Sequence, residues 1–457
     1  MNEPSAPVPP PVSEPQPVVR RYRWGRLGTF AALITIIACI AVVLGDHKSA
    51  LLEKPEGTRP NRMLEMGARY AVGVHHLMQM TGQDTSALTA PMTEDLNRMS
   101  HSPADLLRIT ILKSWMLNTW PSEAAWTEKA GDDAELQKDA EALTQLQTTK
   151  GNGEKEPYVR LHQRHGWMAE LARAQATPAD SPERKVIVDS AIKTALALVG
   201  GSLLGMAAAA CGLVILILGF LRWRRGHLPF TLQRIDPADG GVLMEGFAFY
   251  MALFLLLPGA ILSLPFALPR EVAYLGAGIA VIVGLLWPLW RGMGKPVWRE
   301  AMGMHRGEGL RREMGAGILG WLAALPILVL GMIAASLITK ATGVPPSHPI
   351  MEVFAGNGWA RLGAVILAAV WAPVSEELMF RGMLFPGLSS RLRWVVGTLL
   401  GAFIFAVIHP QGWAGVPAIM TLAIAFSTLR LWRRSLIAPM TAHALNNGSI
   451  SLLMLLM

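Results

Sequence analysis

Three short patterns near the end of the chain hold residue types that could activate water. They read "EELMFR", "FAVIH" and "HALNN". Carboxylates and imidazoles can take a proton from water, and imidazole or amide N–H groups can stabilise an oxyanion. A guanidinium can neutralise one of two adjacent carboxylates. The residues that carry this chemistry are Glu376, Glu377, Arg381, Phe405, His409, His443 and Asn447.

All three patterns interrupt strongly apolar runs. Charged and strongly polar groups cost several kcal/mol in hydrocarbon when they are unpaired, so they are rare there and face one another or a water-filled cavity. Each pattern lies on a different predicted helix, at about 14–24 Å along that helix from its nearest basic end. One shared site at one depth in the membrane is therefore predicted.

Helical spacing assigns a role to each polar group. Glu377 and Arg381 are four residues apart and share one helix face, as do His443 and Asn447. Adjacent residues point about 100° apart, so Glu376 is left to face another helix and act as a general base. His409 would bind the same water molecule as Glu376. His443 and Asn447 on the last helix would stabilise the oxyanion. The same groups could instead join helices or line an ion path.

Composition indicates a membrane protein. The chain has 457 residues, of which 52% are hydrophobic and 16% are charged. The formal net charge of +8 comes from arginines beside apolar runs, so these are topology signals and no nucleic-acid partner is expected. The two cysteines, Cys39 and Cys211, fall inside predicted spans and form no disulfide framework.

The apolar runs predict an all-α, polytopic bundle of about nine spans. Basic connectors alternate with connectors that carry little charge, which places the N-terminus in the cytoplasm and residues 46–184 outside it. The predicted spans are 27–45, 194–221, 245–268, 272–290, 314–338, 362–388, 394–412, 415–431 and 435–456.

The remainder of the chain divides by composition. Residues 46–184 predict a soluble, mostly helical insert, whose histidines have no convincing further metal ligands and whose partner could lie in the envelope. The predicted parts are a disordered proline-rich tail with a basic cluster (1–26), an uncleaved anchor helix (27–45), the insert (46–184), additional transmembrane helices (185–319) and a protease-like domain (320–457).

The order of "EExxxR", "FxxxH" and "HxxxN" on late helices resembles the CAAX protease and bacteriocin-processing family, which includes the type II CAAX prenyl endopeptidases. The resemblance covers roughly residues 320–457. It implies an intramembrane endopeptidase in the bacterial inner membrane that acts on a membrane-associated peptide or protein. Whether that substrate is prenylated and CAAX-like stays open. Glu376 and His409 would activate water, while His443 and Asn447 would stabilise the tetrahedral intermediate.

Two questions stay open at this point. The family is often labelled as metalloproteases, and a zinc ion held by Glu376, His409 and His443 is one option, but a glutamate-dependent mechanism without metal fits the residues and is favoured. The alternative to an enzyme is a non-catalytic scaffold, an immunity factor or a transporter that keeps the same buried polar cluster.

Overall fold

The computed structural model is built of helices, with no strand among the residues that it describes. The proline-rich tail, together with Arg20, Arg21 and Arg23 of the basic cluster, lies outside these residues. The structure describes residues 22, 25–52, 62–98, 102–151, 155–228, 230, 235–264, 272–342, 344, 346, 354 and 358–456. The predicted all-α class is confirmed.

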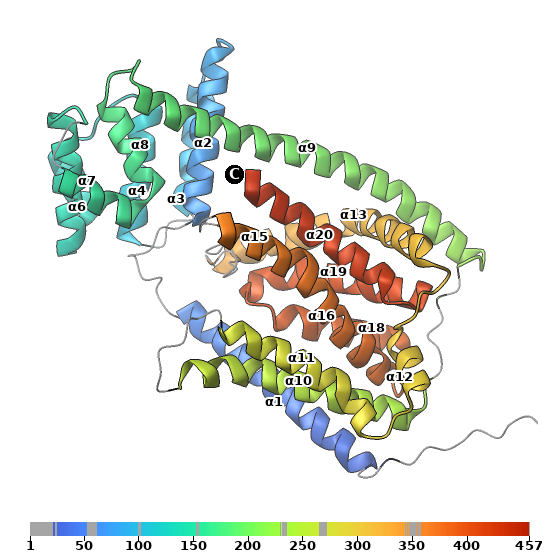
Figure 1. Cartoon of the computed structure of the whole chain (residues 1–457). Helices are drawn as coiled ribbons and strands as arrows, with labels where there is room; N and C mark the ends of the chain where they lie inside the picture. The colour runs from blue at the N-terminus through green and yellow to red at the C-terminus, as the bar shows by residue number, and fades with distance from the viewer. Residues whose placement is uncertain are drawn as a thin grey trace, which may run out of the picture.

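Seven helices between the first and second apolar runs form a unit with its own core, called here the α2–α8 domain (Figure 1). Leucines and tryptophans of these helices make one buried cluster, to which Ile187, Val188 and Ala191 at the start of the next helix also belong. The helices are α2 (Arg62–Met80), α3 (Ser86–Arg98), α4 (Pro103–Met116), α5 (Glu123–Ala130), α6 (Ala134–Thr148), α7 (Lys155–His165) and α8 (Trp167–Ala176).

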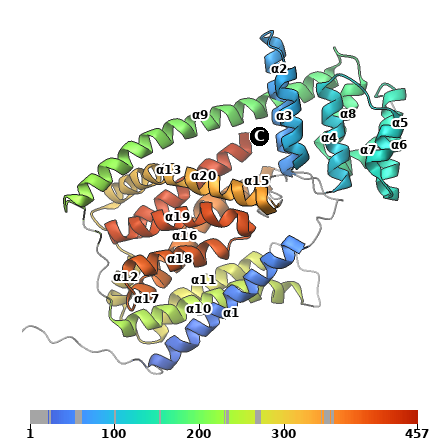
Figure 2. The same cartoon turned by 180° about the vertical axis from the view of Figure 1, so that it is seen from behind.

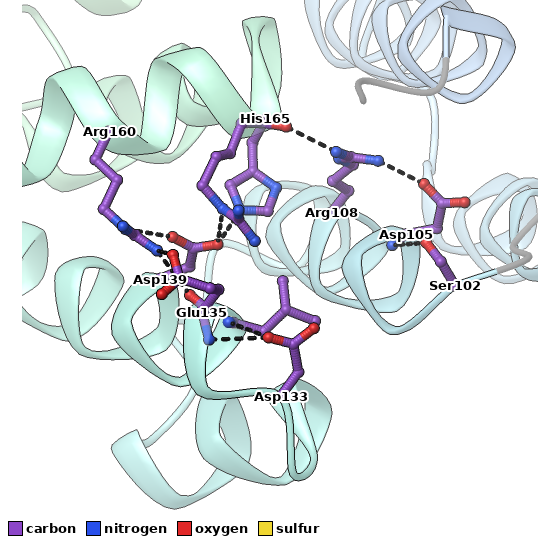
Figure 3. A network of polar contacts seen from close by, with 10 residues as sticks. Ser102, Asp105, Arg108, Asp133, Glu135, Asp139, Arg160 and His165 are labelled. Carbon is purple, nitrogen blue, oxygen red and sulfur yellow. Dashed lines mark hydrogen bonds and ion pairs between the residues drawn. The ribbon is translucent and has the colours of Figure 1, made fainter. Parts of the chain in front are cut away.

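A buried polar network joins helices α6 and α7 of this domain (Figure 3). Asp139 is fully buried and accepts from Arg160 Nε at 3.1 Å, Arg164 Nε at 2.7 Å and His165 Nε2 at 3.1 Å. Burial acts to raise the pKa of Asp139, but the hydrogen bonds from His165 and Arg164 outweigh it and hold this pKa below its ordinary value. Burial lowers the pKa of His165.

The remaining helices form the membrane-embedded bundle (Figures 1 and 2). They are α1 (Gly25–Leu52), α9 (Pro182–Arg224), α10 (Pro237–Leu262), α11 (Val272–Trp290), α12 (Lys295–Met302), α13 (Leu310–Thr342), α15 (Gly358–Ile366), η1 (Leu367–Trp371), α16 (Ala372–Met379), η2 (Phe380–Leu384), α17 (Phe385–Ser389), α18 (Trp394–Val407), α19 (Gly412–Arg433) and α20 (Ile437–Leu456). Within the described part of the chain, six segments are long and apolar enough to cross a membrane, and two apolar helices are shorter, Gly276–Trp290 and Trp394–Val407.

Helix α9 connects the domain to the bundle without a break. Its 43 residues begin in the core of the α2–α8 domain and end at the basic connector after Arg224. The predicted boundary at residue 184 therefore falls inside a continuous helix. Gly212 lets α9 approach α13 closely, because a Cβ atom there would overlap the carbonyl oxygen of Leu322.

Helices α1, α10 and α11 pack together beside the helices that carry the three patterns (Figure 1). A buried carboxylate, Glu245 of α10, joins them: it accepts from Arg291 Nε at 2.6 Å and from Trp287 Nε1 at 3.0 Å. Gly28 of α1 lies directly against this carboxylate. The ion pair makes a charge at this position tolerable inside the bundle.

Candidate functional site

The first pattern lies on one long helix whose winding changes twice. Residues 358–389 are helical throughout, but η1 and η2 are wider, π-helical segments on either side of α16, which carries Glu376 and Glu377. Pro373 and Pro386 follow these segments. Proline has no N–H to close a bond with the residue four positions earlier, so it favours such a local change. Wide turns of this kind often occur at functional sites.

Glu377 and Arg381 form a buried ion pair. Arg381 Nη1 donates to Glu377 Oε1 at 2.9 Å, and its Nη2 donates to the carbonyl oxygen of Ala423 at 3.0 Å. The side chain of Glu377 is 0% exposed and that of Arg381 is 2% exposed. The guanidinium carbon also lies 4.5 Å from the ring centre of Phe405 and 5.3 Å from that of Phe426. The charge of Arg381 is thus enclosed by a carboxylate, a carbonyl and two aromatic faces.

His443 is held in one orientation by this pair. Its Nδ1 lies 2.9 Å from Glu377 Oε1, and since a carboxylate only accepts, Nδ1 is the donor. The imidazole stacks on Phe426 at 4.9 Å between ring centres. Its Nε2 faces Glu376, 3.8 Å from Oε2. Glu377 therefore connects Arg381 to the orientation of His443.

His409 faces the same carboxylate from the turn that follows α18. Its Nδ1 donates to the carbonyl oxygen of Phe405 at 2.5 Å, which fixes the ring, and its Nε2 lies 3.7 Å from Glu376 Oε2. The Oε2 atom of Glu376 is buried and has no hydrogen-bond partner in the structure. The side chains of Glu376 and His409 keep 23% and 18% exposure. A single carboxylate oxygen thus faces two imidazole nitrogens at distances that leave their hydrogen-bonding capacity unused.

Asn447 of α20 is hydrogen-bonded to the backbone of the helix that carries the first pattern. Its Nδ2 donates to the carbonyl oxygen of Ala368 in η1 at 3.0 Å, and its Oδ1 accepts from Asn446 at 3.1 Å. It lies one turn beyond His443 on α20, beside the other predicted residues, but it is bonded to the backbone of the first pattern's helix. One hydrogen of its amide group remains for another acceptor.

The zinc option of the sequence analysis concerns Glu376, His409 and His443. Among the residues that the structure describes, no group of three or more His, Cys, Asp or Glu side chains is arranged to hold a metal ion. The histidines of the α2–α8 domain have other contacts: His75 lies 2.9 Å from the amide of Gln79, and His165 binds Asp139.

Several residues of the site have no signal in the sequence patterns. Phe426 stacks on His443 and covers Arg381, yet it lies on α19, where none of the three patterns falls. Tyr250 of α10 is 3% exposed and packs edge-on against Phe380, 6.5 Å between ring centres, on the helix that carries Glu376. The carbonyls of Ala423 and Ala368 act through backbone atoms that any residue type provides. Only the three-dimensional fold brings these groups to the site.

The apolar helices define an integral, multi-pass membrane protein with a buried polar cluster. Residues 358–449, which hold all three patterns, match the family model described as type II CAAX prenyl endopeptidase Rce1-like. This match confirms the resemblance of the C-terminal segment to the CAAX protease and bacteriocin-processing family.

A curated relative supports the same assignment. The membrane-embedded CAAX protease MroQ of Staphylococcus aureus (strain USA300) is 24% identical over 98 residues, which are 20% of this chain and 39% of that protein. The chain therefore covers about two fifths of the length of this relative. No solved structure matches the chain.

Proposed function

We propose that the protein is an intramembrane endopeptidase that hydrolyses a peptide bond of a membrane-associated peptide or protein. One observation carries the proposal: Glu376 Oε2 faces the Nε2 atoms of His409 and His443 at 3.7 and 3.8 Å. Three hydrogen-bonding atoms from three segments of the chain converge there, and the side chains of Glu376 and His409 are partly exposed. A water molecule at this point would contact all three.

Glu376 is the proposed general base. It takes a proton from the water while His409 orients it, and the resulting hydroxide adds to the peptide carbonyl. The carbonyl oxygen becomes an oxyanion. Glu376 then returns the proton to the leaving amine nitrogen, and the carbon–nitrogen bond breaks to give a carboxylic acid and an amine, which become a carboxylate and an ammonium when the acid's proton passes to the amine.

His443 and Asn447 are the proposed donors to the oxyanion. With Nδ1 bonded to Glu377 at 2.9 Å, His443 turns Nε2 toward the site, where a doubly protonated ring would donate to the oxyanion. Asn447 would use the amide hydrogen that Ala368 leaves free. Glu377 and Arg381 act as positioning residues, because they hold His443 and not the substrate.

The proposed reaction uses no metal ion or other cofactor. The carboxylate and imidazole groups account for each proton in the steps above. Activity that persists after dialysis against a strong chelator would support this part of the proposal, and loss of activity restored by zinc alone would overturn it.

The proposed location is the bacterial inner membrane, with the N-terminus in the cytoplasm. The test of function compares cells that produce the wild type or Glu376→Gln by mass spectrometry of new peptide ends in the membrane fraction. A matched control is Glu308→Gln, because Glu308 is exposed on the loop after α12. Peptide ends that appear with the wild type and with the control, and vanish with Glu376→Gln, are expected. An unchanged set of peptide ends in Glu376→Gln would favour the non-catalytic scaffold, immunity factor or transporter.

A further inference from the structure

Helix α18 is too short to cross the membrane. It has 14 residues, which span about 21 Å, whereas the hydrocarbon core of a bilayer is about 30 Å thick. It begins directly after Arg391 and Arg393, which mark one membrane surface. The opposite end, with His409, therefore stops below the other surface. The turn between α18 and α19 lies within the membrane layer.

The surface toward which this turn points is the one that carries the α2–α8 domain. That domain and α12 lie at opposite ends of the bundle (Figures 1 and 2). The arginines before α18 belong to the α12 end: Arg430, at the basic end of α19, donates to the carbonyl oxygen of Ala301 in α12 at 3.0 Å. The turn after His409 is at the far end of both helices.

Packing closes the α12 end of the site. Every residue from 379 to 388 is buried. Met302 of α12 covers Gly382, and the Ser435 hydroxyl donates to the carbonyl oxygen of His305 at 2.8 Å, which fastens the loop after α12 to the bundle. These packed residues separate Glu376 from the α12 end.

The other end is less tightly packed. Glu376 and His409 keep exposed surface, and Pro410 in the turn is exposed. The next residue, Gln411, has a buried side-chain oxygen with no hydrogen-bond partner in the structure. Non-helical backbone at membrane depth is tolerated only where it is enclosed by protein or lines a water-filled space. The partly exposed turn beside His409 fits the second case.

We propose that the substrate reaches Glu376 from the side of the membrane that carries the α2–α8 domain. This inference rests on the proposed function and adds the class of substrate to it. The cleaved segment belongs to a membrane-anchored peptide or protein and emerges on that side. Because the basic connectors lie at the α12 end, the positive-inside rule makes this the extracytoplasmic side. A cytoplasmic CAAX terminus would arrive at the closed end.

Thiol labelling in membranes tests the side of access. The background is the chain with Cys39→Ala and Cys211→Ala, since these are its two cysteines. Gln411→Cys reports on the turn, Glu123→Cys marks the exposed surface of α5, and Arg306→Cys marks the exposed loop after α12. A membrane-impermeant maleimide is added to intact spheroplasts and to inverted vesicles. Pro410→Cys serves as a second reporter should Gln411→Cys fold poorly.

Gln411→Cys is expected to react with the maleimide in the preparation that labels Glu123→Cys. Its labelling rate there should be at least tenfold higher than in the preparation that labels Arg306→Cys. Three results would overturn the inference: Gln411→Cys reacts in the preparation that labels Arg306→Cys, reacts equally in both preparations, or reacts in neither. Labelling needs no proteolysis, so its outcome is independent of the proposed function. If the protein cleaves no peptide but the turn is labelled from the expected side, the proposed function is refuted and the direction of access stands.

Discussion

Replacing Arg381 with methionine should lower the stability of the bundle far more than the loss of packing contacts alone would. The guanidinium is 2% exposed and is the partner of the fully buried Glu377 carboxylate at 2.9 Å. Methionine keeps most of the volume but leaves that carboxylate without its cation. Removal of one partner from a buried ion pair costs about 3–5 kcal/mol. The free energy of unfolding should fall by this amount.

A double-mutant cycle separates the charge from the packing. Glu377→Gln removes the buried charge, so Glu377→Gln combined with Arg381→Met should be more stable than Arg381→Met by about 1–3 kcal/mol. The assay is reversible unfolding in mixed micelles with increasing SDS, followed by circular dichroism. Two results would refute the role of the ion pair in supporting the site: Arg381→Met lowers the free energy of unfolding by less than about 1 kcal/mol, or the effects of the two substitutions on that free energy are strictly additive.

Three further predictions concern other parts of the molecule. Asp139→Asn should weaken the α2–α8 domain by about 2 kcal/mol at neutral pH, because Arg160 and Arg164 lose a charged acceptor; amide hydrogen exchange of α6 and α7 in the full chain measures it. The wild-type domain should lose stability as pH falls below about 6.5, since folding lowers the pKa of His165 and the unfolded chain binds that proton first, while the lowered pKa of Asp139 adds a second loss only below about pH 4; exchange that is equally slow at pH 7 and pH 5, after correction for intrinsic rates, would contradict the His165 part. Asn447→Ala should lower kcat about 10²–10³-fold if its amide holds the oxyanion, whereas a purely structural role predicts lost stability with kcat retained.

The fold class follows from the sequence because hydrocarbon permits few structures. Apolar runs long enough to cross a bilayer must be helical when their backbone groups can bond only to each other. Composition alone therefore predicts the helical bundle, and the change to polar residues after position 45 predicts the separate helical unit. Exact helix ends are less predictable. The run 394–412 predicts a complete span, but α18 ends at Val407, where a turn beside His409 interrupts it.

The site is predictable where spacing along one helix decides it. Glu377 and Arg381 meet because residues four apart share a face. The contact of Glu376 with His409 and His443 depends on three different segments. The similar distance of each pattern from the basic end of its helix already suggests this contact. The hydrogen bond from Asn447 to Ala368 could not be predicted, since it depends on how α20 packs against the π-helical segment η1. The same holds for Glu245 and Arg291, which are distant in the sequence and form a second buried pair.

The most direct test of the account measures peptide cleavage by the purified protein in proteoliposomes, with a membrane peptide found by the comparison of peptide ends. Wild type, Glu376→Gln and the exposed control Glu308→Gln are assayed at equal folded amounts. The account predicts that Glu376→Gln lowers kcat at least about 10²–10⁴-fold while Glu308→Gln is unchanged, because the loss removes the general base. Glu376→Gln with a kcat within a few-fold of the wild type would contradict the central claim that this carboxylate activates the water.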